Sequence, residues 1–158
     1  MGGGVVLSLV DLAPERVCSL EMISAIGVQE HELTGSYWTN HALHGAQLFI
    51  LLGVKYALPH FGLLDGKELN VEYARNFYDS DQRPLRQVLA AYRGPMLILH
   101  GEQDRNVPMA AAKEHHRLVP QSQLVVLDSN HFMIFQKPEM LVGPLKTFLR
   151  SLTNSCAV

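Results

Sequence analysis

Apolar positions along the chain alternate between short continuous runs and longer runs with helical spacing. The continuous runs predict three strands buried on both faces, at residues 16–24, 96–100 and 124–127. Helical spacing predicts a helix near each of these strands, at residues 5–13, 109–118 and 137–152. Strand–helix alternation of this kind predicts an α/β fold, with a parallel sheet covered by helices on both faces.

Residues 29–92 interrupt this alternation. They contain no clear strand, and the pattern predicts three helices there, at residues 40–56, 70–78 and 84–92. We therefore expect three zones, with residues 1–28 and 93–158 forming the core and residues 29–92 forming a helical insertion. An insertion between two parallel strands is how a lid over an active site is built. The alternative is a helical layer that gates nothing.

Composition narrows the classes of partner. The 158 residues are 47% hydrophobic and 18% charged, which is typical of a globular domain. A net charge of -2 gives no reason to expect nucleic acid or an anionic membrane as partner. The longest apolar run, residues 48–58, is broken by Gly53 and Lys55 and is too short to span a bilayer. Two cysteines, Cys18 and Cys156, predict no disulfide framework, and a cytoplasmic location is expected.

Two chemically useful side chains come after predicted strands. Asp104 lies shortly after the strand at 96–100, and His131 lies shortly after the strand at 124–127. Because the carboxyl ends of parallel strands meet at one edge of a sheet, we expect these side chains to lie close together. A carboxylate and an imidazole are two of the three parts of a nucleophile–base–acid relay. Without further evidence, Asp104 also fits a turn former and His131 a structural loop histidine.

Four segments resemble the C-terminal part of an α/β-hydrolase of the capped, esterase-like type. Residues 1–5 resemble the segment after the serine in the Gly-x-Ser-Met-Gly-Gly elbow, and residues 13–17 are similar to the helix end before the next strand. Residues 95–108 resemble the strand–Gly-x-x-Asp–x-x-Val-Pro segment, and residues 130–139 resemble the histidine loop and last helix. The resemblance implies a partial α/β-hydrolase fold with C-terminal parallel strands, flanking helices and a helical cap.

The resemblance also implies a role for each site residue. Asp104 is the expected acid, His131 the expected general base, and the backbone N–H of Met1 half of the oxyanion hole. The elbow serine would precede Met1, so the chain is expected to lack its nucleophile and to be inactive alone. The implied substrate is a small apolar ester or related acyl compound, and no cofactor or metal is expected. Asn130 and Gln136 depart from the family pattern, which commonly has glycine and an acid at these positions.

No other residue is expected to replace the serine. Ser8 lies inside the first predicted helix, about two turns beyond the elbow, and is not expected to reach His131. Ser24 is expected to bond backbone, and Cys18 is expected to be a small buried hydrophobe. An aspartate in the elbow would instead make the parent an epoxide hydrolase or a dehalogenase. His41 and His44 have helical spacing, which is compatible with a metal site. A metal site is nevertheless not expected there, because no carboxylate or cysteine lies beside them in the sequence.

Two classes of function are compatible with these residues. The first is a serine-dependent hydrolase, and the second is a non-catalytic binding or interaction module derived from the same fold. The reading frame upstream of Met1 separates them, because a hydrolase parent requires an in-frame Gly-x-Ser. In either class the first strand would have an open edge, and we expect self-association through it.

Overall fold

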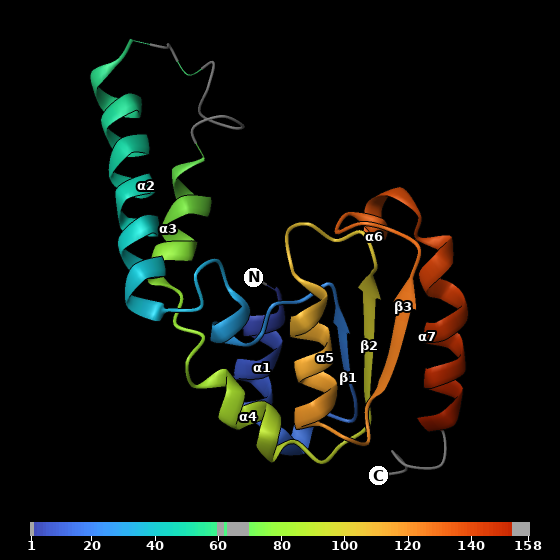
Figure 1. Ribbon diagram of the computed structural model, residues 1–158. Helices are drawn as coiled ribbons and strands as arrows, with labels where there is room; N and C mark the ends of the chain where they lie inside the picture. The colour runs from blue at the N-terminus through green and yellow to red at the C-terminus, as the bar shows by residue number, and fades with distance from the viewer. Residues whose placement is uncertain (1, 60–61, 63–69, 153–158) are drawn as a thin grey trace. The chain divides into compact units, whose positions relative to one another are not determined.

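The computed structural model describes residues 2–59, 62 and 70–152 (Figure 1). The chain forms two compact units, residues 1–31 with 82–158, and residues 32–81. The first unit is built on a three-stranded parallel sheet in the order β1-β2-β3. Its strands are β1 (Leu20–Ile23), β2 (Met96–Gly101) and β3 (Gln123–Leu127). The predicted α/β fold with a parallel sheet is confirmed.

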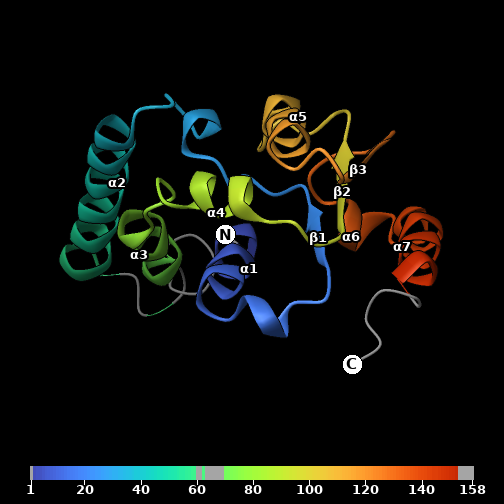
Figure 2. The same cartoon turned by 90° about the horizontal axis from the view of Figure 1, so that it is seen from below.

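Helices cover both faces of this sheet. One face carries α1 (Gly2–Leu12), α4 (Leu85–Ala91) and α5 (Met109–Leu118), and the other carries α6 (Met133–Gln136) and α7 (Glu139–Leu152). Figure 2 shows α5 and α7 on opposite sides of the strands. Alternate residues of β2 enter the two cores, Ile98 on the α1 side and Leu99 on the α7 side. Burial on both faces explains why β2 is a continuous apolar run.

The first strand is shorter than its apolar run predicts. A 3-10 turn, η1 (Pro14–Arg16), precedes it, and pairing with β2 begins only at Leu20. Cys18 lies before that pairing and is exposed, so the prediction that it is a buried hydrophobe is wrong. The last helix begins two residues later than predicted, at Glu139 directly after Pro138, and it contains Pro144 in its interior.

The second unit contains α2 (Tyr37–Ala57) and α3 (Val71–Asp79), which pack against each other. The Asn70 side chain caps α3 by accepting from the backbone N–H of Tyr73 at 2.8 Å. Although α2 has 21 residues, no helix of the described chain is apolar enough over a sufficient length to cross a membrane. Residues 82–92 belong to the first unit, where α4 packs on α1, and a cap formed by residues 29–92 stays a prediction.

The outer face of α1 is apolar and exposed. Val5 is 71% exposed and Leu12 is 83% exposed, whereas Leu7 and Val10 on the opposite face are buried. In the described chain β1 is also an edge strand, paired only with β2. An exposed apolar face beside an unpaired strand edge favours association. Self-association through this edge stays a prediction.

His115 on α5 is a buried histidine whose charge state depends on folding. Its Nε2–H donates to the carbonyl of Ile26, which lies between β1 and the short helix η2 (Gln29–His31), at 2.7 Å. Burial lowers the pKa of His115 from 6.5 to about 4, despite that hydrogen bond. The unfolded chain therefore takes up a proton near the ordinary histidine pKa, and the folded chain does so only near pH 4.

This difference predicts a loss of stability in acid. The free energy of unfolding should fall by about 2 kcal/mol through this group as pH drops across the window between the two pKa values. Urea unfolding at about pH 7 and about pH 4.5 measures the fall. His115→Gln keeps an N–H donor but does not titrate, so its stability should fall less. Equal falls in the two proteins would contradict the prediction.

Candidate active site

Asp104 occupies a tight turn after β2, at the carboxyl edge of the sheet. Its Oδ1 accepts the backbone N–H groups of Asn106 and Val107, each at 2.8 Å. The Asp104 side chain is 0% exposed. Burial raises the pKa of this carboxyl, but the hydrogen bonds from Val107, His131 and Asn106 lower it by more, so the pKa lies below its usual value. The carboxylate is therefore buried and charged.

His131 lies in the loop after β3 and meets this carboxylate. Its Nδ1 lies 2.9 Å from Asp104 Oδ2. Since an ionised carboxylate only accepts, the proton sits on Nδ1 and the lone pair sits on Nε2. No described residue hydrogen-bonds that Nε2, and the side chain is 30% exposed. This is the tautomer that a general base requires.

Continued pairing of the two loops brings acid and base together. Beyond the strands, the Glu102 N–H donates to the Leu127 carbonyl at 2.8 Å and the Gln103 N–H donates to the Ser129 carbonyl at 2.9 Å. Gly101 makes this approach possible, because a Cβ there would lie 2.5 Å from the Ser129 carbonyl oxygen. The parallel sheet thus places both side chains at one edge, marked by the arrowheads in Figure 1.

Two further residues of this edge were not predicted as part of the site. Ser24 directly follows β1 with a φ of +46°, and its buried hydroxyl has no hydrogen-bond partner among the described residues, so the prediction that it bonds backbone is wrong. His100 is 1% exposed within β2, and its Nε2 lies 3.1 Å from the Val107 carbonyl oxygen. The sequence signal for His100 was a histidine inside an otherwise apolar strand. No sequence pattern marked Ser24 as part of the site.

None of the described residues supplies a nucleophile to His131. Ser8 and Cys18 are exposed on or after α1, and Met1, the expected oxyanion donor, lies outside the described residues. Gly3 packs so closely on Ala25 that a Cβ there would lie 2.9 Å from the alanine Cβ. The amino end of α1 is therefore at the same edge of the sheet as the ends of the strands (Figure 1).

The two histidines with metal-like spacing lie in the second unit. The His41 ring stacks between Tyr37 and Tyr78, with the Tyr78 centroid 4.2 Å away. The Nε2 of His44 is 3.7 Å from Glu32 Oε1. Across residues 2–59, 62 and 70–152, no three His, Cys, Asp or Glu side chains form a group that could hold a metal ion.

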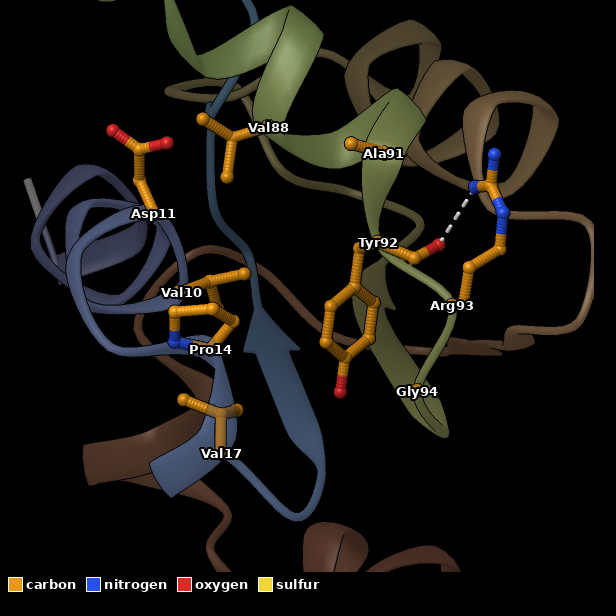
Figure 3. Close-up of a pocket in the computed structure, with 9 residues that line it drawn as sticks. All are labelled: Val10, Asp11, Pro14, Val17, Val88, Ala91, Tyr92, Arg93 and Gly94. Carbon is orange, nitrogen blue, oxygen red and sulfur yellow. Dashed lines mark hydrogen bonds between the residues drawn. The ribbon is translucent and has the colours of Figure 1, made fainter.

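A separate cavity lies at the opposite edge of the sheet (Figure 3). It has a volume of about 340 Å³ and is formed by the end of α1, the η1 turn, α4 and the segment before β2. The Tyr92 ring lines it, with the hydroxyl donating to the Pro95 carbonyl at 3.0 Å. Because Pro95 precedes β2 and Asp104 comes after it, this cavity is remote from the acid–base pair.

The chain is similar to known proteins in fold and in part of its sequence. An esterase from Thermogutta terrifontis superposes with a TM-score of 0.67 at 18% identity, over 96% of this chain and 62% of that one. The AB hydrolase superfamily protein YisY of Bacillus subtilis (strain 168) is 40% identical over 68 residues, which are 42% of this chain and 25% of that protein. The chain has part of an α/β-hydrolase fold.

A second curated relative of this chain is longer still. The dihydrolipoyllysine-residue acetyltransferase component of the acetoin cleaving system of Pseudomonas putida is 29% identical over 168 residues, covering 95% of this chain and 44% of that protein. The chain thus spans less than half the length of either curated relative. No protein-family model matches it.

Proposed function

We propose that this chain provides the acid and the general base of a serine-dependent hydrolase that cleaves a small apolar ester or related acyl substrate. The observation that carries the proposal is the pair of Asp104 and His131. The carboxylate is fully buried, it holds the Nδ1–H of His131 at 2.9 Å, and the opposite nitrogen is open. Buried acid, oriented imidazole and a free Nε2 are what proton transfer from a hydroxyl nucleophile needs.

Each group has one task in this mechanism. The Nε2 of His131 takes the proton of the nucleophilic hydroxyl and later returns it to the leaving alcohol or amine. Asp104 fixes the tautomer of His131 and stabilises the imidazolium that forms. The negative charge on the oxygen of the tetrahedral intermediate would be stabilised by backbone N–H groups, of which the Met1 N–H is our proposed first donor.

We place the nucleophile before Met1 in the parent protein. The tight contact of Gly3 with Ala25 supports this, because a residue preceding α1 would then come close to the edge that holds Asp104. Ser24 is not our nucleophile, because its hydroxyl is buried and forms no hydrogen bond with His131 or with any other described residue. Residues 29–92 as a cap and a cytoplasmic location remain parts of the proposal.

Covalent labelling tests the proposal. The 158-residue chain should give no adduct with a fluorophosphonate by intact mass and no hydrolysis of a p-nitrophenyl ester above buffer. The same chain extended upstream through an in-frame Gly-x-Ser should do both, and replacing that serine by alanine should abolish both. Labelling of the unextended chain that survives His131→Ala but is lost in Ser24→Ala would overturn the proposal.

The two alternatives give different outcomes in the same experiment. An in-frame stop upstream, with a ribosome-binding signal before Met1, would favour the non-catalytic module. An extended chain with aspartate in the elbow would hydrolyse an epoxide or a haloalkane and would resist the phosphonate.

A further inference from the structure

His100 is an unusual residue for the centre of this sheet. It lies on β2, all six residues of which are buried, and its side chain is 1% exposed. A buried imidazole costs desolvation unless its polar atoms are bonded. Its Nε2 is 3.1 Å from the Val107 carbonyl oxygen, and a carbonyl only accepts, so Nε2 carries the proton. Its Nδ1 is buried and has no partner among the described residues, which fits a neutral ring.

The bond from His100 closes the turn that carries the acid. Val107 uses both backbone groups in this turn, its carbonyl accepting from His100 and its N–H donating to Asp104 Oδ1 at 2.8 Å. The other end of the turn is held by the Asp104 N–H, which donates to the Gly101 carbonyl at 3.1 Å. Removing His100 would release one end of the turn and leave a buried carbonyl unpaired.

The same ring flanks the second carboxylate oxygen. The Nε2 of His100 lies 3.9 Å from Asp104 Oδ2, beyond hydrogen-bond distance, whereas His131 Nδ1 lies 2.9 Å from that oxygen. Burial lowers the pKa of His100, with Asp104 opposing and His131 reinforcing the shift, so the ring does not compete as a cation for the carboxylate. Oδ2 is therefore left to His131.

We propose that His100 is a positioning residue, which holds the Val107 carbonyl so that the Asp104 carboxylate stays aimed at His131. The proposal rests on the proposed function only in taking His131 as the base. Its effect on the orientation of His131 is measurable in the 158-residue chain, without a nucleophile or a substrate.

The chain offers a matched control for this proposal. His115 is likewise 1% exposed and likewise donates from Nε2 to a backbone carbonyl, at 2.7 Å. That carbonyl belongs to Ile26, which lies outside the Asp104 turn. A variant of His115 therefore removes an equivalent buried hydrogen bond while leaving the turn intact.

The experiment reads the tautomer of His131 by ¹⁵N chemical shifts and the exchange of its Nδ1 proton with water. In His100→Leu, which keeps the volume but loses the donor, we expect a mixture of tautomers and exchange about ten times faster than in the unchanged chain. His100→Gln keeps a donor at the position of Nε2 and should restore the Nδ1–H form. His115→Leu should leave both readouts unchanged.

A folded His100→Leu chain with unaltered tautomer and exchange would overturn the proposal, as would an equal change in His115→Leu. If His100→Leu does not fold, His100→Asn serves instead, because its amide is too short to reach the Val107 carbonyl. His100→Asn should then differ from His100→Gln, and identical behaviour of the two would overturn the proposal. Absence of esterase activity in an extended chain would count against the proposed function and would leave these readouts unaffected.

Discussion

Asp104→Asn is expected to lower kcat by about 10⁴-fold, without loss of the fold, in the chain extended upstream through the proposed Gly-x-Ser. The amide oxygen must face the backbone N–H groups of Asn106 and Val107, since two donors cannot face the amide nitrogen. The amide NH₂ is then directed at His131, whose Nδ1 has to become an acceptor. The proton moves to Nε2, and the imidazole loses the lone pair that would receive the proton of the nucleophile.

Two measurements check this expectation. Steady-state kinetics on an ester give kcat for the extended enzyme, and ¹⁵N shifts of His131 in the 158-residue chain report the tautomer without any catalysis. Asp128→Asn is the matched control, because Asp128 is an exposed carboxylate at the same edge, bonded to Gln103 Nε2 at 2.7 Å. It should retain full activity. Equal losses in the two variants, or a His131 that already carries its proton on Nε2, would contradict the assignment.

Gly101→Ala is expected to destabilise the chain by about 3 kcal/mol. The added Cβ would lie 2.5 Å from the Ser129 carbonyl oxygen and 3.0 Å from the Asn130 carbonyl oxygen. Both are backbone atoms of the loop that leads into His131, so no flexible side chain can move aside. Relief of the clash requires the two loops to separate, which would also lengthen the bond between Asp104 and His131.

Gly143→Ala provides the contrasting control for this prediction. Gly143 lies inside α7, and no atom beyond its own stretch of helix would come within 4 Å of the new Cβ. Alanine there should change the free energy of unfolding by about 1 kcal/mol at most, because the following Pro144 disfavours a helical residue with a Cβ and offsets the higher helix propensity of alanine. Urea unfolding at one pH gives both values. A Gly101→Ala chain as stable as the unchanged protein would refute the close-approach argument.

The sequence was most informative where burial was uniform. The apolar run of β2 predicted its start at Met96, and the helix after Pro108 was predicted with the bounds that α5 has. The run at residues 16–24 misled, because Val17 and Cys18 are apolar but precede the pairing with β2. Apolar residues predict which positions are buried. The ends of a strand depend instead on which residues form backbone hydrogen bonds with a neighbouring strand.

The candidate site shows a similar division. Parallel strands predicted that Asp104 and His131 would meet at one edge of the sheet, and the structure brings them to 2.9 Å. Their catalytic roles stay predictions. The contribution of His100 could not be predicted, because it acts on the backbone of Val107, seven residues away in the sequence. Residue type marks a contact between a side chain and a backbone group at a helix cap such as Asn70, but it does not mark the backbone partner of His100.

The turn around Asp104 is held by its backbone groups and by the side chains of His100 and Asp104, and not by the side chains of Arg105 and Asn106. Arg105 and Asn106 are exposed, and of the two only the N–H of Asn106 contacts the carboxylate. Their side chains are therefore available for chemical modification. An Arg105→Cys variant would carry a thiol-reactive fluorophore next to the acid–base pair, and the dye would report in real time on any ligand that reaches this edge.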